Sequence, residues 1–140
     1  MLTLVRPSPR EQTQLPELRT AAIIDHLRSV VLTPPALHER GHAIFVDPRR
    51  ACLGEAAFGM GGMSTLQLRM RSLFGEALRL NAAGMILAHN HPSGQCQPSD
   101  CDIAATRRLQ DIGRALDITL IDHLIFTPKA VYSMRAGGLL

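Results

Sequence analysis

Hydrophobic and polar residues alternate along the chain with a period that changes from one segment to the next. From about Glu17 to Leu32, apolar residues recur every three or four positions, which is the period of a helix with one buried face. Pro34 and Pro35 end this helix, because proline cannot continue a helix and disfavours helical geometry in the residue before it. Residues 1–14 are polar and contain proline, so we expect a loose arm there.

The central part of the chain alternates between strand and helix patterns. Residues 42–46 (HAIFV) and 51–58 are expected to form two strands of a hairpin. A helix with an apolar stripe follows and ends near Asn81. Residues 85–88 (MILA) form a short, continuous apolar run, which is typical of a central strand covered on both faces.

A helix from about residue 99 to 116 and two short strands, 118–126 with an interruption and 131–134, complete the pattern. Because strands and helices alternate, the predicted fold is α/β, with a mixed sheet sandwiched by helices. We divide the chain into an N-terminal arm and helix, residues 1–36, and one domain, residues 37–140.

Composition excludes several classes of protein. The chain has 140 residues, of which 46% are hydrophobic and 19% are charged, and this favours one globular domain over a disordered chain. No apolar run reaches the length of a membrane span, and the N-terminal residues contain no hydrophobic segment of signal-peptide length. We therefore expect a cytoplasmic protein without a membrane partner.

The charge pattern gives little support for a nucleic-acid partner. The net charge is +3, and the excess arginine is spread along the chain instead of forming a basic stripe. One tyrosine and four phenylalanines leave few aromatic rings on which bases could stack. The three cysteines are an odd number and do not indicate a disulfide framework.

Candidate chemistry is concentrated in one segment, residues 88–102 (AHNHPSGQCQPSDCD). His89 and His91 lie two positions apart at the end of a predicted strand, so both side chains face the same way. A turn follows, and the next helix presents Asp102 in its first turn. Two imidazoles and one carboxylate give zinc three protein ligands and leave a fourth position for water, as in a catalytic site.

Simpler interpretations exist for each part of this segment. Ser99 and Asp102 have the spacing of a capping box, and taken alone that is the better interpretation of the pair. Cys96 and Cys101 flank the loop, and either thiolate could replace Asp102 as third ligand. The joint occurrence of two histidines on one face, a turn and an acid favours the metal site, and Ser99 can cap the helix and also donate a hydrogen bond into the site.

The spacing His89-x-His91, seven residues, Ser99, two residues, Asp102 resembles the JAMM motif of JAB/MPN-type metalloproteases. The longer string LNAAGMILAHNHPSG resembles the RadC branch of that group, and the likeness runs from about Glu39 to the C-terminus. The resemblance implies a cytidine-deaminase-like JAB/MPN fold, one zinc ion per chain, and hydrolysis of a peptide or isopeptide bond.

The same motif includes a glutamate that precedes the first strand, and Glu39 has that position here. The resemblance implies that Glu39 takes a proton from a zinc-bound water and hands it to the leaving amine. Ser99 would then hydrogen-bond the water or the oxyanion. Without the resemblance, Glu39 would be interpreted as an exposed charge. Glu55 is a rival base, but it lies inside the second predicted strand and fits the motif poorly.

The sequence departs from the RadC pattern in two places. A Pro-Arg-Glu triplet usually starts the helix before the central strand, and the aligned residues here are Met70, Arg71 and Ser72. The helix-hairpin-helix DNA-binding region, usual at the N-terminus of the family, has no room in this sequence. Any substrate contact made by the triplet is therefore in question, whereas the metal ligands are unaffected.

Three further histidines are assigned no catalytic role. Asp122 and His123 resemble an Asp-His pair on a late strand of the family, and we expect His123 to pack behind the ligands. We interpret His26 and His42 as surface or core residues without chemistry.

Three functions are compatible with these residues. The first is a zinc hydrolase, the second is a non-catalytic interaction module of the same fold, and the third is a nucleic-acid enzyme or DNA-repair accessory. A zinc deaminase would need His-x-Glu and Pro-Cys-x-x-Cys, which this sequence lacks. A module would have lost a ligand or the base, and neither is missing. No motif specifies the substrate or the oligomeric state.

Overall fold

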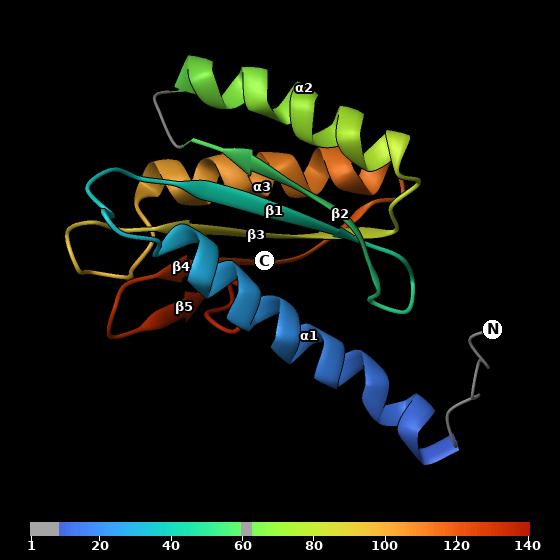
Figure 1. Cartoon of the computed structure of the whole chain (residues 1–140). Helices are drawn as coiled ribbons and strands as arrows, with labels where there is room; N and C mark the ends of the chain where they lie inside the picture. Colours follow the sequence, from blue (N-terminus) through green and yellow to red (C-terminus); the bar gives the residue numbers. More distant parts are fainter. Residues whose placement is uncertain (1–8, 60–62) are drawn as a thin grey trace.

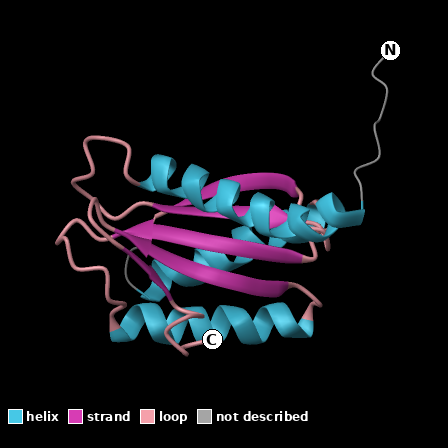
Figure 2. Ribbon diagram, turned by 90° about the horizontal axis from the view of Figure 1, so that it is seen from below, coloured by secondary structure: helices cyan, strands magenta, loops and turns pink. Residues whose placement is uncertain are grey.

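In the computed structural model, which describes residues 9–59 and 63–140, a five-stranded sheet lies between helices on both faces (Figure 1). The helices are α1 (Pro9–Val31), α2 (Met63–Arg79) and α3 (Asp100–Ala115). The strands are β1 (Gly41–Val46), β2 (Cys52–Phe58), β3 (Gly84–Asn90), β4 (Thr119–Phe126) and β5 (Val131–Ser133). Helices α2 and α3 cover one face of the sheet, and α1 crosses the other face (Figure 1). Figure 2 shows the same arrangement seen from below. The predicted α/β sandwich is confirmed.

The sheet is mixed, with the strand order β2-β1-β3-β4-β5. Strand β3 runs parallel to β4, and the other neighbouring pairs are antiparallel. Strand β3 is the middle strand and is buried along its whole length, which explains its continuous apolar sequence. The carboxyl end of β3 lies beside that of β4, with His89 paired to Ile125. The ends of neighbouring parallel strands are where α/β sheets usually place their sites.

Two apolar layers hold the helices against the sheet. Alternate residues of β3 contribute to each, so Met85 and Leu87 face α2 and α3 while Ile86 and Ala88 face α1. The α1 layer also contains Ile23, Leu27 and Val31 from the helix and Ile44, Val46, Leu124 and Phe126 from neighbouring strands. The alternation continues beyond the apolar run and places His89 on the α3 side of the sheet.

Two expectations about element boundaries were wrong. Helix α1 begins at Pro9, well before Glu17, so residues 9–14 are helical and do not belong to a loose arm; residues 1–8 lie outside the described part. Proline is tolerated in the first turn of a helix because its missing N–H needs no partner there. Strand β4 is continuous, and its pairing with β3 shifts register at Ile121 instead of being interrupted.

The described helices include none that is both long and apolar enough to cross a bilayer.

Truncation of a buried side chain of α1 tests how much that helix contributes to the fold. Leu27 is fully buried in the layer between α1 and the sheet. We expect Leu27→Ala to lower the free energy of unfolding by about 2–5 kcal/mol, because the lost methyl groups leave a cavity. Leu78→Ala is the control, since Leu78 is 56% exposed on α2 and its loss should cost less than about 0.5 kcal/mol. Urea unfolding measures both values, and equal losses would contradict the docking of α1.

Candidate metal centre

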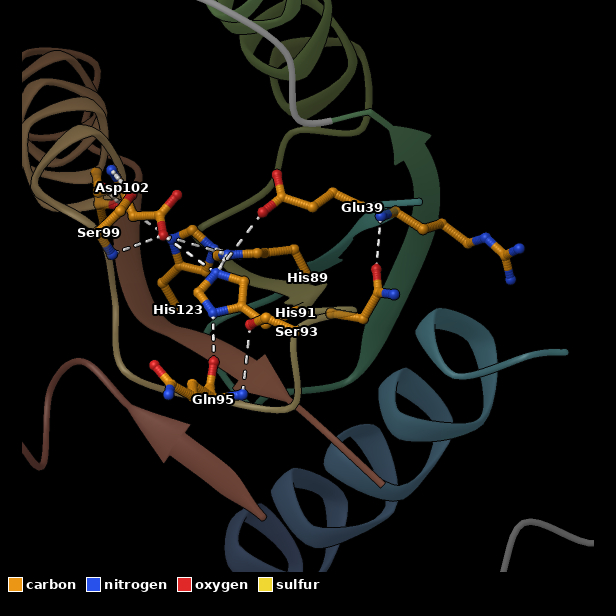
Figure 3. A network of polar contacts seen from close by, with 11 residues as sticks. Glu39, His89, His91, Ser93, Gln95, Ser99, Asp102 and His123 are labelled. Carbon is orange, nitrogen blue, oxygen red and sulfur yellow. Dashed lines mark hydrogen bonds and ion pairs between the residues drawn. The ribbon is translucent and has the colours of Figure 1, made fainter. Parts of the chain in front are cut away.

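The three predicted ligands converge at the carboxyl end of β3 (Figure 3). The Nε2 atoms of His89 and His91 are 3.0 Å apart. Asp102 Oδ2 lies 3.6 Å from the first nitrogen and 3.3 Å from the second. Ligands bound to one tetrahedral zinc ion at about 2.0–2.2 Å are roughly 3.3 Å from one another. The triangle of donor atoms therefore has the size that a single zinc ion requires.

The loop after β3 brings His91 back towards the sheet. Its backbone N–H donates to the carbonyl of Phe126 at the end of β4, at 3.0 Å. The Gly94 N–H donates to the His91 carbonyl at 3.1 Å, and Gly94 has a φ of 85°, in the left-handed region that favours glycine. This tight turn keeps the connection to α3 short and directs its first turn at the histidines.

A complete capping box begins α3. The Asp102 N–H donates to Ser99 Oγ at 3.1 Å, and the Ser99 N–H donates to Asp102 Oδ2 at 2.9 Å. The oxygen that caps the helix is the same oxygen that faces the histidines. Capping and metal-facing geometry are thus compatible, because the cap fixes the Asp102 carboxylate in the orientation that the site needs.

A chain of hydrogen bonds determines which nitrogen of His89 carries a proton. The Thr106 hydroxyl donates to the Asp102 carbonyl at 2.6 Å, so its oxygen is left to accept from His123 Nδ1 at 2.8 Å. His123 Nε2 must then accept from His89 Nδ1, at 2.7 Å. His89 therefore presents an unprotonated Nε2 to the site.

His91 has the same tautomer for a separate reason. Its Nδ1 lies 2.7 Å from the carbonyl of Gln95, which can only accept, so Nδ1 carries the proton. In the neutral rings, two nitrogen lone pairs therefore face each other across 3.0 Å beside a carboxylate. Three electron-rich atoms at this spacing repel one another unless a cation or proton lies between them. The donor set fits a metal ion.

The charge states of Asp102 and His123 follow from their burial and from their neighbours. Burial of Asp102 opposes its ionisation, but the neighbouring His89 ring and the hydrogen bond from the Ser99 backbone outweigh it and hold the pKa of the Asp102 carboxyl well below its ordinary value. Burial lowers the pKa of His123 to about 3, and the neighbouring His89 adds to this effect. A neutral His123 is the form that the hydrogen-bond chain requires.

Glu39 lies at the edge of the same centre. Its Oε1 is 3.8 Å from His91 Nε2, and its side chain is 39% exposed. Sequence reasoning missed the residue that holds it there. Asn90 accepts a hydrogen bond from the Arg40 N–H at 2.6 Å and donates to the His38 carbonyl at 3.1 Å, so it grips the backbone on both sides of Glu39. The only sequence signal for this role is an amide at the end of a fully buried strand.

Comparison with known proteins shows the family of this chain. Residues 18–139 match the family described as RadC-like JAB domain. The chain belongs to this family. UPF0758 proteins of Chloroflexus aurantiacus and Roseiflexus castenholzii are 44% and 39% identical over 72% of the chain, and one of Paraburkholderia xenovorans is 31% identical over 93%. The chain spans only 43–58% of the length of these relatives.

The RadC-like JAB domain differs locally from what its sequence indicated. The match begins at residue 18, within α1, whereas the motif resemblance in the sequence begins only at about Glu39. Met70, which aligns with the first residue of the Pro-Arg-Glu triplet, lies midway along α2 and is buried in the core.

Neither the rival base, Glu55, nor the rival ligands, Cys96 and Cys101, belong to the group of ligating side chains that contains His89 and His91. Glu55 hydrogen-bonds His26 and His42 instead of the predicted ligands. The described groups of metal-ligating side chains contain neither Cys96 nor Cys101, and both thiols are free. The group around His89 and His91 has Glu39 as its third member and does not include Asp102. Asp102 remains a candidate ligand because its Oδ2 lies 3.6 Å from His89 Nε2 and 3.3 Å from His91 Nε2.

The lowered pKa of His123 makes the stability of the RadC-like JAB domain depend on pH. Between about pH 3 and the ordinary histidine pKa of 6.5, the unfolded chain binds a proton at residue 123 that the folded chain does not. Stability therefore rises with pH across this window, by up to about 1.4 kcal/mol per pH unit. We expect His123→Gln to reduce this slope in urea unfolding of the protein kept with a chelator. An unchanged slope would contradict a neutral His123.

Proposed function

We propose that this domain binds one zinc ion through His89 Nε2, His91 Nε2 and Asp102 Oδ2 and hydrolyses a peptide or isopeptide bond. The observation that carries the proposal is the convergence of two nitrogen lone pairs and one carboxylate oxygen within 3.6 Å of one another. Zinc with three protein ligands supplies an open position where a water becomes acidic enough to react near neutral pH and a carbonyl can be polarised.

Glu39 is the general base in this proposal. Its carboxylate is grouped with His89 and His91, but it lies 3.8 Å from His91 Nε2, farther than Asp102 Oδ2 at 3.3 Å. Because Glu39 is also partly exposed, it can reach both the attacking water and the substrate. Glu39 takes a proton from the water and later delivers it to the nitrogen of the leaving amine. The grip of Asn90 on the backbone at residues 38 and 40 keeps the carboxylate beside the centre.

Ser99 supports the oxyanion in this proposal. In the capping box its Oγ accepts the Asp102 N–H, which leaves the hydroxyl hydrogen available for donation. That hydrogen can be directed to the negative oxygen of the tetrahedral intermediate. Ser99 is exposed, whereas His89 and Asp102 beneath it are buried, so the reacting bond approaches from the Ser99 side.

Metal analysis tests the ligand assignment. We expect elemental analysis by mass spectrometry to find close to one tightly bound zinc ion per chain in the purified protein. His91→Ala should lose this ion, because only two donor atoms remain to hold it. His38→Ala is the matched control, since this histidine is exposed and belongs to no group of ligating side chains in the described residues. A His91→Ala variant that keeps one zinc ion bound as tightly as in the unmodified protein would overturn the assignment.

Substitution of Glu39 tests the reaction separately from the metal. Glu39→Gln keeps the size of the side chain but cannot accept a proton, so zinc content should be unchanged while cleavage falls by about 100-fold or more. Cleavage is measured with a panel of fluorogenic peptide and isopeptide substrates. Glu76→Gln is the control, since Glu76 on α2 is partly exposed and pairs with Arg79 instead of the candidate ligands. If Glu39→Gln cleaves as fast as the unmodified protein, the base is another residue.

A further inference from the structure

A second group of metal-ligating side chains lies on the opposite face of the sheet. It consists of His26 on α1, His42 on β1 and Glu55 on β2. His42 alternates with Ile44 and Val46, which pack under α1, whereas His89 faces α3. The second group is thus separated from the first by the thickness of the sheet.

The donor atoms of this group converge on one carboxylate oxygen. Glu55 Oε2 lies 2.7 Å from His26 Nε2 and 3.1 Å from His42 Nε2, and all three atoms are within 4.8 Å of one another. The contacts with both histidines lower the pKa of the Glu55 carboxyl, so it is ionised and available as a ligand. Small displacements would open these atoms to the spacing of about 3.3 Å around a tetrahedral ion.

We propose that His26, His42 and Glu55 form a second site for a divalent transition metal such as zinc. Two imidazoles and a carboxylate are ligands that this class of ion accepts readily. The side chains of His26 and Glu55 are 46% and 45% exposed, so an ion can enter from solvent and they can adjust around it. His42 is buried and supplies the fixed ligand.

The second site is the weaker of the two, and His42 is the reason. Histidine ligands are normally held by a hydrogen bond from the ring nitrogen that does not bind the metal, and loss of that bond typically costs 10–100-fold in affinity. His89 and His91 both have such a partner at Nδ1. His42 Nδ1 is buried without a partner among the described residues. Zinc therefore fills the first site before the second.

An ion at this site connects elements that an ion at the first site does not. It joins α1 to both strands of the β1–β2 hairpin, three elements that meet only in the folded chain. A ligand that binds only the folded state raises its apparent stability with the logarithm of the ratio of the ligand concentration to Kd. Zinc at the second site should therefore raise the unfolding temperature independently of hydrolysis.

Calorimetric titration of the metal-depleted protein with Zn²⁺ tests this site. We expect two zinc ions per chain, one tight and one weaker by about 10-fold or more. His26→Ala should lose the weaker ion and keep the tight one, and His91→Ala should show the reverse. Glu55→Gln should weaken the second ion by about tenfold or more, because a neutral amide replaces the carboxylate. His38→Ala should keep both ions.

The unfolding temperature provides an independent measurement. Zinc should still stabilise His91→Ala, in which only the second site remains, and should not stabilise the double variant His26→Ala, His91→Ala. Binding of a single zinc by the unmodified protein, or retention of the weaker ion in both His26→Ala and Glu55→Gln, would overturn the second site. Loss of only the weaker ion in His26→Ala, with no loss in His91→Ala, would support the second site and reject the proposed catalytic ligands.

Discussion

The hydrogen bond between His89 and His123 is the contact on which the metal centre depends. The Thr106 hydroxyl donates to the carbonyl of Asp102, so its oxygen accepts from His123, and His123 in turn accepts from His89. The backbone carbonyl of Asp102 therefore fixes which nitrogen of His89 carries the proton. Asp102 thus acts twice: its carbonyl orients the hydrogen-bond chain, and its carboxylate faces the nitrogen that this chain leaves unprotonated. The first turns of α3 therefore supply the Asp102 carboxylate and fix the tautomer of His89.

Burying so many polar groups is tolerable only because each of them is bonded. His89, Asp102, His123 and Thr106 are all nearly inaccessible to solvent, and an unpaired polar group in such a position costs about 1–3 kcal/mol. Hydrogen bonds satisfy every ring nitrogen and hydroxyl of these residues and of the adjoining His91 except the two Nε2 atoms, of His89 and His91, that face Asp102. The exceptions coincide with the candidate metal position, as expected if an ion completes the cluster.

The parts of the site that depend on local strand and helix patterns could be predicted from the sequence. The parts that depend on how distant elements pack together could not. Strand alternation places His89 on the α3 side of the sheet, and helix-capping spacing brings Asp102 into the first turn of α3. His91 lies just beyond β3, so the loop and its hydrogen bond to Phe126, instead of the strand period, place it. Glu39 required the family resemblance, because its position is set by hydrogen bonds from Asn90, 51 residues away from it. The contact of His123 with His89 needed the parallel pairing of β3 with β4. The grouping of His26 and His42 with Glu55 could not be predicted, because the three residues lie on three elements that meet only in the fold.

The two groups of ligating side chains are nonetheless linked through the start of β1. His42 is paired with Ala88 and Gly41 with His89, so β1 lies next to β3 in the sheet beside both groups, and its side chains alternate between the two faces. Arg40 lies between them and Glu39: its side chain donates to carbonyls at the end of α1, while its backbone exchanges hydrogen bonds with Asn90. The candidate base is therefore held by the same junction of α1 and β1 that His26 and His42 join. An interaction that tightens this junction restricts Glu39 without touching the three candidate zinc ligands.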